Sequence, residues 1–197
     1  YGGSNGTATV SVSGGTLTYT YFWSNATGAS TTIGLISGTY TCNITDANGC
    51  QINSGNIFIN QPSEIIITSS NTSVSCYGGS NGTATVSVSG GTGMYAYVWN
   101  PGPQITPNAI GLISGNYDCT ITDANGCPKN SGNIIVSQPL PLTITMSTTD
   151  VWCTAASNGT ATATPSGGTG PYTYLWSNGS TSQTITGLSS NTSYTVI

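Results

Sequence analysis

The chain has 197 residues, of which only 3% are charged, with one lysine, no arginine and no histidine. The lack of histidine excludes Ser-His-Asp and Cys-His catalysis and imidazole metal sites, and one cation cannot neutralise a nucleic-acid backbone. No run of about 18 apolar residues is present, so we expect no membrane insertion of this segment. The 11 Tyr and 4 Trp disfavour disorder, so we expect a folded protein. Because the residues of these catalytic and metal sites are missing, we expect no enzyme activity and no cofactor.

An internal repeat organises the sequence. Residues 1–16 return unchanged as residues 77–92, and a looser copy begins at Ser157. Self-similarity of this strength marks an array, and the period is long enough for each unit to be a small domain. We predict a first repeat over 1–62 that lacks its first strand, a complete second repeat over 63–139, and a third repeat over 140–197, truncated in its sixth strand.

The two ends of the chain cut across this pattern. We interpret the sequence as a window on a longer array. The alternative is that both ends are natural, in which case the incomplete first and third repeats would be organised like those of donor-strand polymers.

The second repeat predicts short strands bounded by Gly, Asn and Pro. In chain order, the expected strands cover residues 64–76, 83–89, 95–99, 105–113, 117–122 and 134–136. Within 83–89 apolar and polar residues alternate, and the turn at 123–126 closes a hairpin. These features predict an all-β sandwich. Because Gln138-Pro139 leads directly into the next repeat, we expect the tandem domains to form a rod.

Two aromatic positions favour an immunoglobulin-like sandwich. A tryptophan stands on the third strand of each repeat, and a Tyr-x-Cys or Tyr-x-Val sequence opens the strand that covers 117–122 in the second repeat. The tyrosine lies where such sandwiches have a tyrosine corner. The predicted core aromatics are Trp23, Trp99, Trp176, Tyr40, Tyr117 and Tyr194.

Four phrases of the sequence resemble a known family. They read CYGGSNGTATVSVSGGT, GPYTYLWSNG, GLISGTYTCNITDANGC and the closing QP. They are similar to the SprB repeat, found in giant cell-surface adhesins of gliding Bacteroidota and related to PKD-type immunoglobulin-like modules. The resemblance implies an extracellular adhesin or surface fibre of a bacterial cell, a role in gliding motility and export by the type IX secretion route.

The six cysteines follow the repeat, without a CxxC motif. Val196 stands where the second repeat has Cys119, so we expect Cys42 and Cys119 to be buried thiols. Disulfides are the default in an extracellular chain, and Cys76 with Cys127 matches the two cysteines usual in the family. Pairing of the Cys76 and Cys127 positions is favoured over pairing of Cys76 with Cys119. The bridge could lie within one repeat or join two repeats. The disulfide candidates are Cys76, Cys127, Cys50 and Cys153.

Other candidate sites have simpler structural explanations. Asp46 and Asp123 each stand alone in a DANG turn, so a turn function is favoured over calcium binding. Isopeptide cross-links would need a lysine in every repeat, and Lys129 is the single one. The aromatic face made by Tyr19, Tyr21 and their counterparts is expected to line the core rather than stack on sugars.

The opposite strand face carries apolar residues where solvent would favour polar ones. These possible lateral contacts are Phe22, Val98, Leu175, Phe58 and Ile135. With almost no charge to repel neighbours, we expect association with copies of the same chain. The resulting prediction is a structural or adhesive segment of an extracellular filament. The alternative is a glycan-binding sandwich array, accessory to a secreted hydrolase, whose partners would be surface glycans.

Overall fold

The computed structural model describes residues 1–152 and 156–197, and their regular structure consists of β-strands alone. The sheets are antiparallel, which confirms the predicted all-β class of sandwich repeats. Contacts divide the chain into two compact units, and the boundary between these units passes through the second repeat. The three repeats are described one at a time, and repeat 1, repeat 2 and repeat 3 mean residues 1–62, 63–139 and 140–197.

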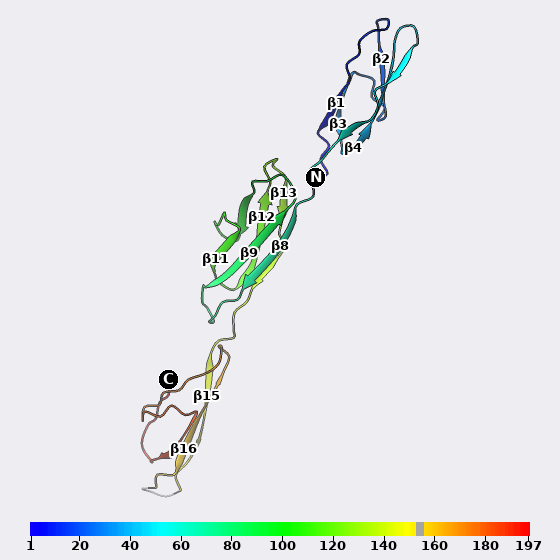
Figure 1. Ribbon diagram of the computed structural model, residues 1–197. Coiled ribbons are helices and arrows are strands. Elements are labelled where there is room, and N and C mark those ends of the chain that lie inside the picture. The colour runs from blue at the N-terminus through cyan, green and yellow to red at the C-terminus, as the bar shows by residue number, and fades with distance from the viewer. Residues whose placement is uncertain (153–155) are drawn as a thin grey trace. The chain divides into compact units, whose positions relative to one another are not determined.

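Repeat 2 contains two sheets. One sheet has the strand order β11-β9-β8, and the other has the order β10-β12-β13 with β14 also paired to β12 (Figure 1). The first sheet consists of β8 (Ile66–Thr72), β9 (Gly82–Ser89) and β11 (Asn108–Leu112). The second consists of β10 (Ala96–Asn100), β12 (Gly115–Thr122), β13 (Pro128–Asn130) and β14 (Ile134–Val136).

The alternating side chains of repeat 2 form its core. Ala84 and Val86 on β9 are buried, as are Tyr117, Cys119 and Ile121 on β12. Threonines and serines occupy the outward positions of β9. A period-two pattern of this kind puts one face of each sheet in the core and the other in solvent.

The predicted last strand, 134–136, is present as β14, and a strand that was not predicted, β13, precedes it. Both β13 and β14 pair with β12. All three residues of β13 are exposed, so no apolar alternation marks this segment as a strand. The first strand is also shorter than the predicted range 64–76, although Ile65 and Val74 outside it are both buried.

Repeat 1 is described from Tyr1, the position that corresponds to Tyr77 in repeat 2. Its strands are β1 (Gly6–Thr9), β2 (Thr20–Trp23), β3 (Thr31–Leu35), β4 (Gly38–Tyr40), β5 (Cys42–Thr45), β6 (Gln51–Asn53) and β7 (Ile57–Ile59). They pair as β1-β3, β2-β5-β6 and β4-β7. The core consists of Ala8, Trp23, Leu35, Cys42 and Ile44.

Repeat 3 keeps the three-stranded sheet of repeat 2. It contains β15 (Thr143–Thr149), β16 (Gly159–Ser166) and β17 (Thr184–Leu188), in the order β15-β16-β17. An antiparallel bridge between Trp176 and Val196 stands where repeat 1 pairs β2 with β5.

Candidate functional site

The third-strand tryptophans lie in the core. Trp23, Trp99 and Trp176 are at most 2% exposed. Each indole N–H donates to a backbone carbonyl, at 2.7 to 2.8 Å, and the acceptors are Ala29, Thr106 and Ser182. Because both the ring and its polar atom are occupied, these tryptophans offer no stacking surface to a sugar.

The tyrosines that precede the tryptophans hold the Gly-Gly turns. The hydroxyl of Tyr19 donates to the Gly14 carbonyl at 2.5 Å. Tyr95 and Tyr172 make the same bond to Gly90 and Gly167. The sequence analysis missed this contact, although the constant spacing of five residues between glycine and tyrosine in all three repeats was the available signal.

A tyrosine corner is present in repeats 1 and 2. The hydroxyl of Tyr40 donates to the Ile36 carbonyl, and that of Tyr117 donates to the Ile113 carbonyl, both at 3.1 Å. In repeat 3 the arrangement changes, because the backbone N–H of Ser189 donates to the Tyr194 hydroxyl at 3.4 Å. The bond in repeats 1 and 2, from a tyrosine hydroxyl to a backbone carbonyl four residues earlier, is the one that defines a tyrosine corner in immunoglobulin-like sandwiches.

The aspartate of each DANG turn accepts three backbone hydrogen bonds. Asp46 accepts hydrogen bonds from the N–H groups of Thr16, Asn48 and Cys50, at 2.8 to 3.0 Å. These bonds, the one from Thr16 first, hold the pKa of Asp46 below its ordinary value. The carboxylate thus ties the DANG turn to Thr16, the residue after the Gly-Gly turn. Calcium takes six to eight oxygen ligands, whereas this carboxylate is engaged by backbone N–H groups.

Asp123 repeats this arrangement in repeat 2. It accepts from Cys127 at 2.9 Å and from Thr92 and Asn125 at 3.0 Å. The bond from Cys127 is the main cause of its lowered pKa. Within 1–152 and 156–197, no group of three or more His, Cys, Asp or Glu is placed to hold a metal.

The cysteines fall into two environments. Cys42 and Cys119 are fully buried, and burial raises the pKa of both thiols. Cys50 and Cys76 are exposed, Cys127 is half-buried, and all five of these thiols are free. Cys153 lies outside the described residues. A buried thiol of raised pKa is a poor nucleophile, so Cys42 and Cys119 act as apolar core residues.

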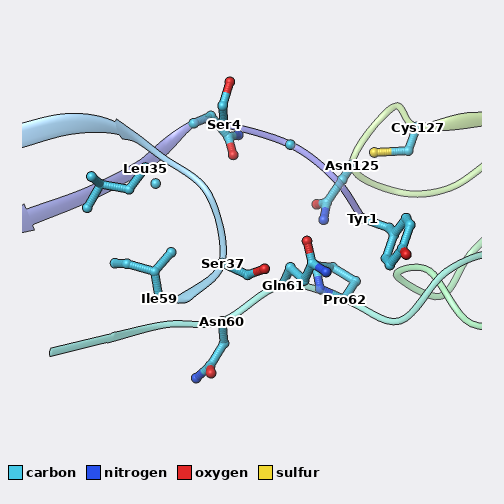
Figure 2. A pocket seen from close by; sticks show the side chains of 13 residues that line it. Tyr1, Ser4, Leu35, Ser37, Ile59, Asn60, Gln61, Pro62, Asn125 and Cys127 are labelled. Atoms are coloured by element: carbon cyan, nitrogen blue, oxygen red, sulfur yellow. The ribbon is translucent and has the colours of Figure 1, made fainter. Parts of the chain in front are cut away.

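The two ends of a repeat are marked by hydrogen bonds that occur in both repeat 1 and repeat 2. In repeat 1 the Gly2 N–H donates to the Gln61 side-chain oxygen at 3.0 Å, beside Tyr1 (Figure 2). The Asp46 turn, which contains Cys50, instead accepts a hydrogen bond from Thr16, which follows β1 at the opposite end of the repeat.

This separation bears on the disulfide prediction. Gly78, two residues after Cys76, makes the Gly2-type bond to Gln138 at 2.8 Å, whereas Cys127 belongs to the Asp123 turn. The eight residues of β9 connect these ends and span about 26 Å, whereas disulfide-linked Cα atoms lie within about 7 Å. Within repeat 2 this separation disfavours a Cys76–Cys127 bridge. A pairing between these two cysteine positions stays a prediction for cysteines of different repeats or of different chains.

Large apolar side chains are exposed at the same position of every repeat. Phe22, Val98 and Leu175 are 64%, 59% and 51% exposed. Phe58 and Ile135 share another exposed position, as do Ile33 and Ile110, which the sequence analysis did not single out. Phe22 and Phe58 lie opposite Asn43 and Thr39 on neighbouring strands. In repeat 2, Val98 and Ile135 belong to the sheet of β12, whereas Ile110 belongs to the sheet of β9, so these exposed positions lie on different sheets. Each is an apolar, uncharged candidate contact.

A comparison with protein-family models matches three segments of the chain. The SprB repeat model matches residues 1–28, 68–104 and 145–181, which together cover half of the sequence. The chain belongs to the SprB-repeat family. Membership suggests the repeat region of a cell-surface adhesin. A search of curated proteins finds no match. None of the described residues forms a helix long and apolar enough to cross a bilayer.

Proposed function

We propose that this SprB-repeat chain is a structural and adhesive segment of an extracellular fibre on a bacterial cell surface, exported by type IX secretion in a gliding bacterium. Each repeat adds length, and its surface contributes weak contacts to neighbouring copies or to a substratum. Weak contacts at fixed spacing reinforce one another, because each contact after the first is effectively intramolecular. Family membership supports the cell-surface part of this proposal.

The observation that carries the proposal is the recurrence of exposed apolar residues on a neutral surface. Phe22, Val98 and Leu175 occupy one outward position in three repeats. The single lysine of the sequence, Lys129, is paired with Glu64 at 2.9 Å between Nζ and Oε1. Since little free charge remains to repel or orient a neighbour, contacts between such surfaces would be apolar and insensitive to salt.

Localisation on intact cells tests the cell-surface proposal. Antibodies raised against the folded chain are applied to cells that carry the protein, before and after permeabilisation, with and without external protease. The proposal predicts full labelling of intact cells and loss of the signal after protease treatment. Labelling that requires permeabilisation would overturn it.

Glycan binding is the second candidate, and a specific observation supports it. Trp152 is 90% exposed and Tyr77 is 59% exposed, so aromatic rings are available outside the core. Exposed aromatic faces are a common means of stacking on sugar rings. A glycan array probed with the native chain and with Trp152→Ala and Tyr77→Ala tests this candidate. Glycan binding that either substitution abolishes would favour it, and no binding would reject it.

A further inference from the structure

One edge strand of each repeat has an outer side without a partner strand. β11 stands at the end of the order β11-β9-β8 (Figure 1), and β3 and β17 pair with β1 and β16 alone. Backbone groups on the outer side of an edge strand are available to pair with another chain. Three equivalent edges thus occur in one protein, each with its own surroundings.

In repeat 2 the outward groups of this edge are occupied. The Val86 N–H donates to the Pro107 carbonyl at 2.9 Å, and backbone groups of successive residues on an antiparallel strand point to opposite edges. The backbone of Ile110 therefore faces away from β9. Its N–H donates to Oε1 of Gln104 at 2.9 Å, and its carbonyl accepts from Nε2 of the same amide at 3.0 Å.

The amide of Gln104 thus imitates a partner strand. In a hydrogen-bonded pair of an antiparallel ladder, the residue opposite exchanges the same two bonds, one given and one received. The carbonyl of Asn108, the other outward residue of β11, accepts from the Thr106 hydroxyl at 2.6 Å. Two side chains of the preceding loop therefore close this edge, and they show that it binds groups with the chemistry of a polypeptide backbone.

Repeat 1 has neither of these closing side chains. Thr27 stands at the place of Gln104, because the carbonyl of each accepts from the backbone N–H of the third-strand tryptophan. Ala29 stands at the place of Thr106, because the carbonyl of each accepts from the indole of that tryptophan. The Thr27 hydroxyl donates within its own loop, to the side chain of Asn25.

The edge of β3 is bare as a result. The Val10 N–H donates to the Ser30 carbonyl at 3.0 Å, so Thr31 and Ile33 direct their backbone groups outward. Among residues 1–152 and 156–197, no side chain is bonded to these outward groups. The Ile33 side chain beside them is 72% exposed.

Repeat 3 resembles repeat 1 at this edge. Ser180 and Ser182 occupy the places of the two closing side chains. In the part of the chain that the structure describes, neither serine is bonded to the outward backbone groups of Thr184 and Thr186. β17 therefore has a bare edge as well.

We propose that the bare edges of β3 and β17 are strand-pairing sites, and that their occupant is the corresponding edge of a second copy of the chain. This contact rests on the proposed association of copies, and it aligns copies that the apolar positions hold together. A second copy brings both groups that match the edge of β3, namely free backbone donors and acceptors and an exposed Ile33. Pairing of this kind extends an exposed sheet edge by one strand.

The edge of β3 is unguarded but short. The strand carries no charge and no proline, the residues that usually discourage pairing at edges. Its regular ladder ends after Ile33, where Gly34 has a φ of 71° and the register with β1 shifts. Pairing over so few residues gives a weak contact that adds to the apolar contacts and does not replace them. Repeated along an array, such contacts reinforce one another.

Hydrogen exchange at single amides tests this contact. The full chain is compared at a dilution where it is monomeric and at a concentration where it associates. We expect the Ile33 amide to exchange freely in the monomer and about tenfold more slowly in the associated protein. The Ile110 amide, bonded to Gln104, should be slow in both.

The outcomes separate this contact from the proposed function. Association that leaves the exchange of Ile33 unchanged would overturn the edge contact alone. A chain that never associates would overturn the edge contact together with the proposed association. An Ile33 amide that is already slow in the monomer would also reject the site, because the edge would then be closed within one chain.

A variant that opens the edge of β11 provides a second test. Gln104→Met with Thr106→Val removes both closing groups at similar side-chain size. The Ile110 amide should then exchange fast in the monomer and slowly after association. Ile105→Ser is the matched control, because it changes the exposed residue between the two and keeps both bonds, so its Ile110 amide should stay slow. An opened edge that gains no protection on association would refute the proposal.

The reverse change closes the edge of repeat 1. Residues 24–30 are replaced by the sequence of residues 100–107, which contains both closing side chains. The Ile33 amide should then exchange slowly even in the monomer, with no further slowing on association. If association still slowed Ile33 tenfold in this variant, as in the native chain, the assignment of the loop as the closing element would be wrong.

Discussion

The carboxylate of Asp123 accepts a hydrogen bond from the backbone N–H of Thr92 at 3.0 Å, while its other oxygen accepts from Asn125 and Cys127. One side chain thus joins the hairpin turn after β12 to the loop after β9. Asp46 and Thr16 make the same connection in repeat 1. These two carboxylates hold the most conspicuous polar contacts of an otherwise nearly uncharged protein.

The stability of the protein should therefore fall in acid. The pKa of Asp46 and of Asp123 lies below the ordinary value of 3.8, so each stabilises the fold at neutral pH. This contribution is complete above the unfolded-state pKa and is lost as the pH falls through the lower, folded-state pKa. We expect the melting temperature of the native chain, followed by circular dichroism, to drop as the pH falls below about 4.

The variant that tests this cause is Asp46→Asn with Asp123→Asn. It keeps an acceptor oxygen in each turn but cannot titrate, so it should be less stable than the native chain at pH 7 and lose less stability in acid. Parallel curves for the two proteins from pH 7 to pH 2 would show that other groups cause the acid dependence.

The two Gly-Gly turns of identical sequence should respond differently to alanine. A Cβ on Gly90 would lie 1.9 Å from the Glu64 carbonyl oxygen, whereas a Cβ on Gly14 meets no atom within 4 Å. Both glycines have a positive φ, so both substitutions cost about 1–2 kcal/mol in backbone strain.

Gly90→Ala should cost about 1–3 kcal/mol more than Gly14→Ala, because it also displaces the chain at Glu64. Hydrogen exchange of fragments 115–137 and 38–60, whose sequences differ, reports on repeats 2 and 1 separately. Equal losses in the two repeats would mean that the segment before β8 does not pack on this turn.

The tyrosine corner predicts a modest and local loss. Tyr117→Phe keeps the buried ring and removes the hydrogen bond to the Ile113 carbonyl, so we expect a loss of about 1 kcal/mol in the free energy of unfolding. Tyr77→Phe is the control, because Tyr77 is exposed. Urea denaturation compares the two variants, and a control loss as large as that of Tyr117→Phe would refute the assignment.

The cysteines should react in an order set by burial. Under native conditions an alkylating reagent should label Cys50 and Cys76 within minutes, and Cys42 and Cys119 only after unfolding. Mass spectrometry of the digested protein measures this order. Fast native labelling of Cys119 would contradict its place in the core.

Substitution of Cys119 tests the same environment by stability. Cys119→Val should change the free energy of unfolding little, since the position is apolar and fully buried. Cys119→Ser should lower the free energy of unfolding by about 1–3 kcal/mol, because it moves a hydroxyl group from water into an apolar core. A serine variant as stable as the valine variant would speak against an apolar site.

Side-chain periodicity predicted the parts of the fold that local pattern controls. The alternation around Ala84 predicts β9, and Tyr-x-Cys at Tyr117 predicts a corner whose hydrogen bond is present. The segment β13 escaped prediction because none of its residues is buried. It is a strand because the DANG turn folds it back onto β12, and a turn-directed edge strand needs no apolar pattern.

Other features depend on contacts that the sequence does not display. Residues 1–16 and 77–92 are identical, so no reading of them could give strands of four and eight residues. Here the tertiary surroundings override local preference. The hydrogen bond from the Tyr19 hydroxyl to the Gly14 carbonyl is another example, because the sequence pattern indicated only that this tyrosine faces the core.

Sedimentation velocity of the full chain tests the central claim that copies associate through apolar, uncharged surfaces. The native chain is compared over a range of concentrations, at low and high salt, with the triple variant Phe22→Ser, Val98→Ser and Leu175→Ser. All three side chains are exposed, so the variant should stay folded. We predict association of the native chain that is independent of salt and lost in the variant. A native chain that remains monomeric at every concentration, or a variant that associates equally well, would contradict the account.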